Sequence, residues 1–385
     1  MREPDTFDFM VKHVRTRGTL ASLAAELGVS RTTVSNAYNH PDQLSAHTRQ
    51  RILEAATARG YPGPDPMARS MRTRRVGAIG VLLTEHLSYA FEDVASVDFL
   101  AGLTESTYGT DSALTMIPAG PESGEDLVAA NALLGRAVVD GFVVYSVAQD
   151  DAHLAAARAR QLPLVICDQP TDVADLPFVG IDDRAAIRPA ACALLEAGHR
   201  RIGILSIRLN RIRLDGLVDH STLPGADLHV QRARIQGALD EFAEAGIAPE
   251  TVPVITRHIN DRPNSVDAAR ELLETYPDLT AVLCTTDSMA FGVMEYAESR
   301  GISVPEDLSI TGFDGIRDAL YRGLTTVIQP NRAKGAAAGR LLQELIDARV
   351  TDAPASAQEE TIRQILPTTF HPGTTVSFPR SGSVV

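Results

Sequence analysis

The first sixty residues repeat apolar side chains at helical spacing in three short segments. In the segment that begins at Thr19, apolar residues recur three and four positions apart until Gly28, which ends it. Ser30 follows as a cap for a second segment, and a third runs over 45–60. This pattern predicts three helices, with a tight turn between the first two, that close a small core.

The second predicted helix turns small polar side chains outward. Val34 and Ala37 face inward, and the outer positions carry almost no aliphatic bulk. A helix that opens with an arginine and small hydroxyl residues suits phosphate oxygens and base edges, which is the use of the second helix in helix-turn-helix proteins. A helical hairpin that contacts no DNA is the alternative. The outward residues are Arg31, Thr32, Thr33, Ser35 and Asn36.

From residue 76 onward, short and nearly continuous apolar runs alternate with helical periodicity. Apolar strands separated by helices predict parallel sheets covered on both faces, and so many strands fit two doubly wound α/β lobes better than one. The predicted strands lie in 76–83, 113–118, 141–147, 163–168, 178–181, 201–207, 251–256, 280–285 and 308–313. The predicted helices lie near 93–108, 124–135, 151–160, 183–197, 230–245, 264–275, 287–300 and 333–349.

Polar residues stand where several predicted strands end. Because ligands bind outside the carboxyl ends of parallel strands, we expect Thr84, Asp168, Thr286 and Asp314 to meet in one cleft. Short acceptors suit a hydroxyl-rich ligand such as a sugar, since a buried acceptor rejects analogues that lack its hydroxyl. A helix cap is the alternative for each aspartate, and it is the favoured interpretation of Asp287.

Some further features of the sequence leave more than one role open. Tyr89 and Phe91 follow the first strand, and they either stack on a ligand ring or belong to ordinary packing. Residues 208–231 form a polar loop that is long for a compact domain, and we expect part of a lid or of a subunit contact there. His199 and His258 have no evident nucleophile partner and are expected on the surface.

The composition of the 385 residues, 44% of them hydrophobic, fits large buried cores. No apolar run approaches the roughly 18 residues that span a membrane, and the N-terminus is too acidic for a secretory signal peptide. Cys167, Cys192 and Cys284 are widely separated and predict buried thiols, with a disulfide or metal site as the alternative. We therefore expect a cytoplasmic protein, associated with the nucleoid.

Charge is divided unevenly along the chain. Residues 1–75 hold 12 Lys or Arg against 7 Asp or Glu, whereas residues 76–385 hold 24 against 42. A basic head on an acidic body confines the attraction for phosphate to one end of the chain. It predicts that binding to nucleic acid weakens steeply as the salt concentration rises. Only Lys12 and Lys334 are lysines, which codon usage explains most simply. After the proline-rich break, basic residues crowd around Met71, namely Arg69, Arg72, Arg74 and Arg75.

The order of these segments resembles the lactose repressor and galactose repressor family of bacterial transcription factors over about residues 19–370. This ordered set is more specific than any single motif. The matching stretches are VSRTTVSNAYN (29–39), SAHTRQRILEAATARGY (45–61), PDPMARSMRTRR (64–75), VGAIGVLL (76–83), VDGFVVY (139–145), PLVICD (163–168), LLEAGHRRIGILS (194–206), RIQGALDEF (234–242), TTDSMAFGVMEYAESRGISVPEDLSITGFDG (285–315) and LTTVIQP (324–330).

The resemblance implies an all-α helix-turn-helix headpiece, a linker helix and an α/β body with the fold of periplasmic sugar-binding proteins. The chain is expected to cross between the two lobes near 168–177 and 322–330. The implied divisions are an N-terminal extension (1–18), the headpiece (19–62), the linker (63–75), a first lobe (76–168 with 325–370), a second lobe (169–324) and a tail (371–385).

Within the headpiece and linker, the resemblance implies contacts in both DNA grooves. Asn36 stands where many members have arginine, and because asparagine prefers an adenine edge where arginine prefers guanine, the preference at that base pair should not be copied from relatives. Met71 stands where the family has a leucine that wedges into the minor groove, and packing within the linker is its alternative. The residues implied at DNA are Thr19, Ser30, Arg31, Thr32, Thr33, Ser35, Asn36, Arg69, Met71 and Arg72, with Arg31, Thr32 and Asn36 on base edges and Thr33 and Ser35 on phosphates.

Within the body, the resemblance implies a small-molecule effector held by Asp168, Arg234 and Asp314, beside the strand-end and aromatic residues named above. Thr286 stands where the family often has asparagine. Lobe closure on the effector is expected to be linked to operator affinity. One headpiece reads too few base pairs for specificity, so a dimer or tetramer on a near-palindromic operator is expected.

The expected function is therefore a ligand-responsive, DNA-binding regulator, most simply a repressor of carbohydrate or related metabolic genes. No cofactor, metal site or catalytic residues are expected, because the chain lacks the GxxxxGK[ST], HExxH and GxSxG motifs. A sugar-binding protein without DNA function and a sugar-modifying enzyme with a fused DNA-binding head are the two rival classes.

Overall fold

The computed structural model describes residues 18–65, 70, 73–83, 91, 93–110, 112–120, 126–351 and 361–380. The chain divides into two compact units, Met1–Val76 and Gly77–Val385, and each is described by itself. Within the described ranges, no helix is both long and apolar enough to cross a membrane.

The described part of the first unit is a bundle of three helices with a tight turn between the first two. Thr19, Ser30 and Ser45 cap the helices, each accepting a hydrogen bond from a backbone N–H three residues further on. Gly28 ends the first helix in the left-handed conformation, with φ of 65°. The elements are α1 (Leu20–Leu27), α2 (Arg31–Asn39), the 3₁₀ turn η1 (Pro41–Gln43) and α3 (Ala46–Ala58).

The core of this bundle comes from the inward faces of all three helices. Tyr38 and Tyr61 close one side of it edge to face, with ring centroids 6.0 Å apart. Because the apolar positions are used up inside, the outer face of α2 is left polar. The buried core residues are Leu23, Ala24, Val34, Ala37, Ile52 and Ala56.

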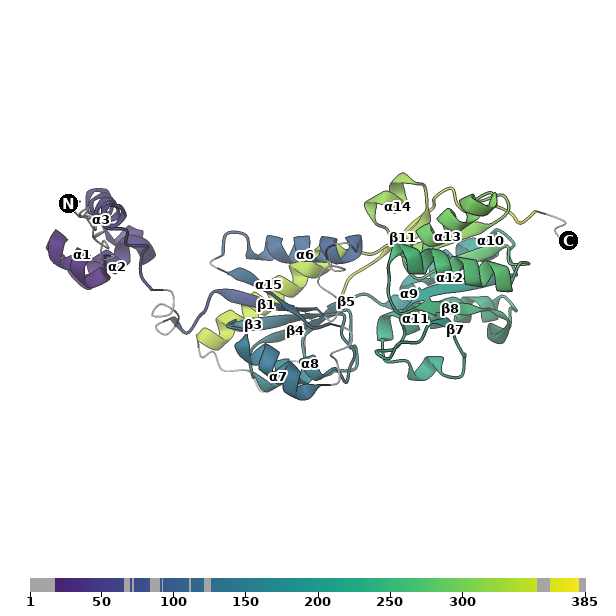
Figure 1. Ribbon diagram of the computed structural model, residues 1–385, viewed down its shortest axis with the longest axis horizontal. Helices are drawn as coiled ribbons and strands as arrows, with labels where there is room; N and C mark the ends of the chain where they lie inside the picture. The colour runs from purple at the N-terminus through teal and green to yellow at the C-terminus, as the bar shows by residue number, and fades with distance from the viewer. Residues whose placement is uncertain are drawn as a thin grey trace, which may run out of the picture. The chain divides into compact units, whose positions relative to one another are not determined.

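The second unit contains two sheets, each with helices on both faces (Figure 1). The first sheet is entirely parallel, in the order β12-β5-β4-β3-β1-β2. One face packs on α7 and α8 and the other on α6 and α15, and we call this assembly the first lobe. Its strands are β1 (Ala78–Leu83), β2 (Ala113–Pro118), β3 (Gly141–Tyr145), β4 (Leu164–Cys167), β5 (Phe178–Gly180) and β12 (Arg363–Ile365). Its helices are α6 (Val94–Thr107), α7 (Leu127–Arg136), α8 (Ala152–Ala159) and α15 (Asn331–Val350).

The second sheet, in the order β13-β11-β10-β9-β6-β8-β7, is parallel except for its antiparallel edge strands β7 and β13. Helices α9 to α11 cover one face and α12 to α14 the other, and we call this assembly the second lobe. Its strands are β6 (Ile202–Ile207), β7 (Gly216–Leu217), β8 (Val254–Arg257), β9 (Ala281–Cys284), β10 (Ser309–Asp314), β11 (Thr325–Ile328) and β13 (Thr369–His371). Its helices are α9 (Asp183–Ala186), α10 (Arg188–Glu196), η2 (Leu223–Gly225), α11 (His229–Glu244), η3 (Pro249–Thr251), α12 (Arg262–Thr275), α13 (Asp287–Arg300) and α14 (Arg317–Tyr321).

The strand order reverses once within each sheet. In the first lobe the reversal lies between β1 and β3, and in the second lobe between β6 and β9. Doubly wound sheets bind ligands at the carboxyl ends of the strands beside such a reversal. The topology therefore marks two strand pairs, one in each lobe, as the floor of a binding site. The predicted fold class, a helical headpiece with two doubly wound lobes, is confirmed.

Helices α6 and α15 lie side by side (Figure 1) and leave no room for a side chain at two positions of their contact. A Cβ at Gly335 would lie 2.0 Å from the carbonyl oxygen of Phe99, and one at Gly102 would lie 1.8 Å from that of Arg332. Glycine is therefore required at both positions, and this contact fixes the start of α15 against the first lobe.

The observed lobe limits differ from the expected ones. Strand 178–180 adds to the first sheet beside β4, so the chain crosses after it and not within 168–177. Strand 325–328 pairs with β10, so it belongs to the second lobe and not to the first, and the return crossing at 329–330 lies within the expected 322–330. Within the described chain a third crossing follows β12, because β13 pairs with β11 and the expected tail is tied to the second lobe by Thr375.

Candidate functional site

The outer face of α2 presents the predicted DNA-contacting residues in two different states. Arg31 and Thr32 are exposed. The hydroxyls of Ser30 and Thr33 lie 2.8 Å apart and bond to each other, as parts of the helix cap. Thr19 likewise serves its own helix, in a reciprocal cap with Ser22. Recognition of DNA by the exposed pair stays a prediction.

Asn36 is held by a residue that the sequence pattern did not single out. Its Nδ2 donates to Oε1 of Gln43 at 2.9 Å, which orients the amide on the outer face. Ser35 accepts a hydrogen bond from Nδ2 of Asn39 at 3.1 Å. Three further residues predicted to contact DNA, Arg69, Met71 and Arg72, lie outside the described residues.

In the second unit, a cavity lies between the two lobes at the strand ends that the topology marks. Its lining includes Leu83 and Tyr145 from β1 and β3, Ile207 from β6, and Thr286 just after β9. Its volume is about 100 Å³, below the roughly 300–1,000 Å³ typical of ligand pockets. It adjoins a groove of about 850 Å³, and Asp314 lines both. The cavity alone is thus smaller than a sugar-sized pocket, and the adjoining groove provides further space beside Asp314.

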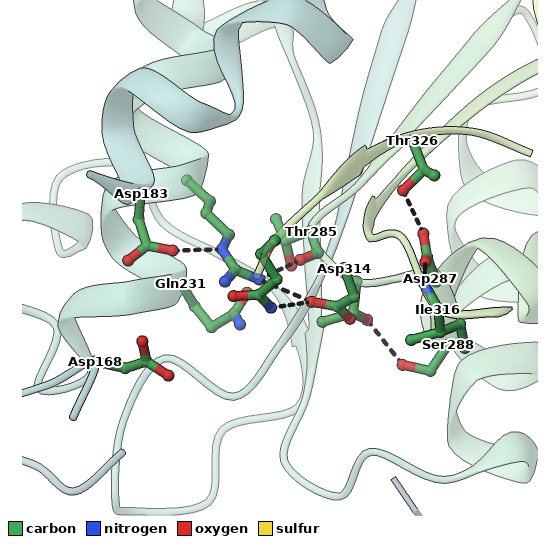
Figure 2. A network of polar contacts seen from close by, with 12 residues as sticks. Asp168, Asp183, Gln231, Thr285, Asp287, Ser288, Asp314, Ile316 and Thr326 are labelled. Carbon is green, nitrogen blue, oxygen red and sulfur yellow. Dashed lines mark hydrogen bonds and ion pairs between the residues drawn. The ribbon is translucent and has the colours of Figure 1, made fainter. Parts of the chain in front are cut away.

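Arg234 is the centre of the second lobe's part of this cavity, and Figure 2 labels two of the residues that it contacts, Asp183 and Thr285. Its Nε donates to Oδ1 of Asp183 at 2.8 Å, and its Nη1 donates to the carbonyl oxygen of Thr285 at 2.9 Å. The guanidinium also lies over the ring of Phe313, 3.8 Å from the centroid, and 3.6 Å from Oδ1 of Asp314. The Arg234 side chain is only 4% exposed, and these contacts fix its guanidinium in one orientation.

Two aspartates beside Arg234 are buried, and burial disfavours their charged forms. Burial raises the pKa of Asp183 to about 6, against the opposing effect of Arg234. Burial also raises the pKa of Asp314 well above the ordinary value, and Arg234 again opposes it. Asp314 has φ of 123°, which non-glycine residues rarely adopt and which is found where a site holds its backbone.

Asp168 meets the cavity from the first lobe and is paired with a lysine. Nζ of Lys334 lies 2.8 and 2.9 Å from its two carboxylate oxygens. The same Nζ donates to Oε1 of Gln329 at 2.8 Å, and Nε2 of Gln329 donates to Oδ1 of Asp314 at 2.6 Å. The predicted ligand residues of the two lobes are thus joined by one buried hydrogen-bonded chain.

The helix cap expected at Asp287 is instead provided by Thr286. Thr286 has the extended backbone of a capping residue, and its Oγ1 accepts from the N–H of Met289 at 3.3 Å. Asp287 is the first helical residue and is fully buried, and Figure 2 shows it beside Thr326 and Ile316. It accepts from the N–H of Ile316 and from Oγ1 of Thr326, at 2.9 and 2.6 Å. Asp287 therefore connects α13, α14 and β11. Thr286, as the cap, uses one of its lone pairs for the helix and has fewer left for a ligand.

The cavity also contains residues that the sequence analysis missed or misplaced. Arg208 and Gln329 each follow a strand, so the strand-end rule could have found them. Gln231 lies in α11, which begins inside the segment expected to be a loop. His258 was expected on the surface but is buried and lines the cavity. His199 is also buried, bonded to Thr280 and to the backbone of Ser377.

The remaining predictions for this region have mixed outcomes. Phe91 is 60% exposed and is not among the described residues that line the cavity. Thr84 and Tyr89 lie outside the described residues. All three cysteines are free thiols, with Cys192 half-buried and the other two buried. Among the described side chains, no group of three or more His, Cys, Asp or Glu is arranged to hold a metal ion.

Comparison with known proteins agrees with this architecture. Residues 191–376 match the family described as "Periplasmic binding protein-like domain". The "HTH-type transcriptional regulator IpsA" of Corynebacterium glutamicum is 57% identical over 360 residues, which cover 94% of this chain and 98% of the relative. A crystal structure of a LacI family transcriptional regulator from Corynebacterium glutamicum is 54% identical and superposes with a TM-score of 0.73, covering 94% of this chain and all of that one. A complex of the transcriptional regulator CelR with cellobiose is 26% identical, with a TM-score of 0.65, 93% of this chain covered and 100% of that one. The chain therefore belongs to the lactose repressor (LacI) family of bacterial transcriptional regulators.

Proposed function

We propose that this regulator binds a near-palindromic operator as a dimer and that a neutral, hydroxyl-rich molecule in the interlobe cavity controls its affinity for that operator. The observation that carries the proposal is the set of buried polar side chains, from both lobes, at the strand ends beside the two topological reversals. We infer that it acts in the cytoplasm on carbohydrate or related metabolic genes, and that the cavity binds its ligand without catalysing a reaction.

The chemistry of the cavity favours hydroxyl groups. Asp168 and Asp314 present carboxylate oxygens, and Arg234 and Gln231 present N–H donors. A hydroxyl both donates and accepts, so a polyol or sugar can meet both kinds of group. The structure of the regulator CelR is a complex with cellobiose, which supports a sugar-like ligand for a cavity built on the same fold.

The proposed DNA contacts follow from the exposed face of α2. Arg31 and Thr32 would meet base edges in the major groove, and Asn36 would read an adenine edge. The linker residues around Met71 would order in the minor groove when two copies pair on DNA. Two copies are required because one headpiece reads too few base pairs to select a site among the roughly 10⁶ or more competing genomic sites.

Control by the ligand requires two states of the body. Because the cavity is lined by residues of both lobes, we infer that ligand binding selects one arrangement of the lobes over another. If the operator also prefers one of these states, ligand and DNA each change the other's affinity by the same factor.

A thermal-shift screen of sugars, polyols, sugar phosphates and nucleosides tests this proposal. We expect a neutral sugar or polyol to raise the melting temperature of the wild-type protein, and Asp314→Asn to abolish that rise. Asp278→Asn, at an exposed aspartate before β9, is the matched control and should keep it. No shift from any neutral compound, or a shift retained in Asp314→Asn, would contradict the assignment of the cavity. Turnover of a sugar in the presence of ATP would favour an enzyme instead.

A further inference from the structure

Lys334 is a buried lysine in a chain that otherwise relies on arginine. The sequence has 34 arginines and two lysines. The Lys334 side chain is 1% exposed and belongs to the first turn of α15. An ammonium group has three N–H donors, and three acceptor atoms on Asp168 and Gln329 lie within 2.9 Å of Nζ. Every donor is therefore matched, and codon usage no longer explains the residue.

The lysine gives Asp168 the counter-charge that a buried carboxylate requires. A carboxylate left unpaired in the interior costs several kcal/mol, whereas a hydrogen-bonded pair is tolerated. One Nζ occupies both oxygens of Asp168 from one side, and a carboxylate has about four lone-pair positions. The positions that remain are available on the side of the cavity, which Asp168 lines.

The lysine also sets the orientation of Gln329 and, through it, of Asp314. The carbonyl end of the Gln329 amide accepts from Lys334, so the NH₂ end must point to Asp314. Asp314 and Asp183 both lie at Arg234, so one chain of polar contacts runs from the end of β4 to the start of α9. Two of its members lie at crossings between the lobes, Asp183 where the polypeptide enters the second lobe and Gln329 where it returns to the first.

We propose that Lys334 is a positioning residue for effector binding, which holds the ligand-facing carboxylates of both lobes in register and couples two of the crossings between them. This inference rests on the proposed function of the cavity. Arginine is not equivalent at this position, because its planar fork does not bring three donors to one point.

A double-mutant cycle in the full-length protein tests the pairing without any ligand. Lys334→Met should lower the melting temperature by about 10 °C, because Asp168 is left buried and unpaired. In the double variant with Asp168→Asn, at least half of the lost melting temperature should be recovered. The single variant Lys334→Arg should melt below the wild type. Arg340→Met, at an exposed cation of the same helix, is the control. Losses that simply add in the double variant would overturn the pairing.

Hydrogen exchange separates positioning from general stability. In Lys334→Met, peptides that cover 168–183 and 326–335 should exchange faster, while those from α12 and β8 should not change. Faster exchange throughout the second unit would reduce Lys334 to a structural residue.

Calorimetric titration with the neutral compound that most stabilises the wild type completes the test. Lys334→Met should weaken binding at least about 10-fold, and Arg340→Met should leave it unchanged. Equal affinity in Lys334→Met and the wild type would overturn the inference. If no compound binds the wild type, the proposed ligand class is wrong, and the cycle and the exchange data decide on Lys334 by themselves.

Discussion

The headpiece and the interlobe cavity gather similar polar side chains but hold them in opposite ways. On α2, Arg31 and Thr32 are exposed, and the hydrogen bonds around them join residues only three to seven positions apart. Arg234, which lines the cavity, and Lys334, which pairs with the lining residue Asp168, are buried, and their carboxylate partners lie 51 and 166 positions away in the chain. The exposed α2 side chains keep their donors in water, whereas Lys334 and part of the Arg234 guanidinium already donate to other protein groups.

This difference determines what a mutation should change. A polar side chain on α2 can be removed without leaving an unpaired group in the interior, so the effect should appear in DNA binding alone. A polar side chain in the cavity cannot be removed in that way, because its partner remains buried. Comparing stability with binding for matched variants therefore tests whether the two regions have the proposed roles.

The largest effect is expected at Arg234. Arg234→Met removes the partner of Asp183 in a site where both side chains are at most 4% exposed, so unfolding should become easier by about 3–5 kcal/mol. Arg184→Met breaks an ion pair with Asp240 whose partners are about half exposed and should cost no more than about 1 kcal/mol. Urea unfolding measures both, and similar losses in the two variants would contradict the difference between buried and exposed pairs.

Asp183 should make the stability of the second unit depend on pH. Burial raises its pKa in the folded protein to about 6, above the ordinary 3.8. Its contribution is therefore fully present below pH about 4 and is lost as the pH rises through about 6. Two pKa units correspond to roughly 3 kcal/mol. Between pH 4 and 7, the free energy of unfolding should fall less steeply with pH in Asp183→Asn than in the wild type. Identical slopes in the two proteins would show that the carboxyl group does not titrate in this range.

In the headpiece, Arg31→Ala should weaken operator binding by about 1–3 kcal/mol without lowering stability. Arg31 is exposed at the start of α2 and supports no other described element. An operator selected from a random DNA library, titrated at fixed salt, provides the measurement, and thermal unfolding provides the control. Unchanged affinity would remove Arg31 from the DNA interface.

The smallest effect is expected at Ser30, where the headpiece does depend on a polar side chain. Ser30→Ala removes the hydrogen bond to the N–H of Thr33 and should cost about 1 kcal/mol of headpiece stability. Thr32→Ala, at an exposed neighbour without a capping role, should cost less. If both variants unfold like the wild type, the cap does not stabilise α2.

The same contrast explains what the sequence could predict. The caps, the glycine turn and the core of the headpiece depend on neighbours within a few positions, so periodicity was enough to predict them. In the body, the strand-end rule led to Asp168, Thr286 and Asp314 and could have led to Arg208 and Gln329. Lys334 and Gln231 lie inside helices, and no local pattern marks them. The short edge strands β7, β12 and β13 also lack periodicity, because their pairing partners decide them.

The central claim is that the two regions, opposite in their exposure, form the two ends of one ligand-controlled switch. Its most direct test is the affinity for a selected operator, measured by fluorescence anisotropy with and without the compound that stabilises the body in the thermal-shift screen. A coupling of about 1–3 kcal/mol predicts a change in operator affinity of about 5- to 150-fold, which Asp314→Asn should abolish. Equal operator affinity with and without a saturating concentration of that compound would contradict the account.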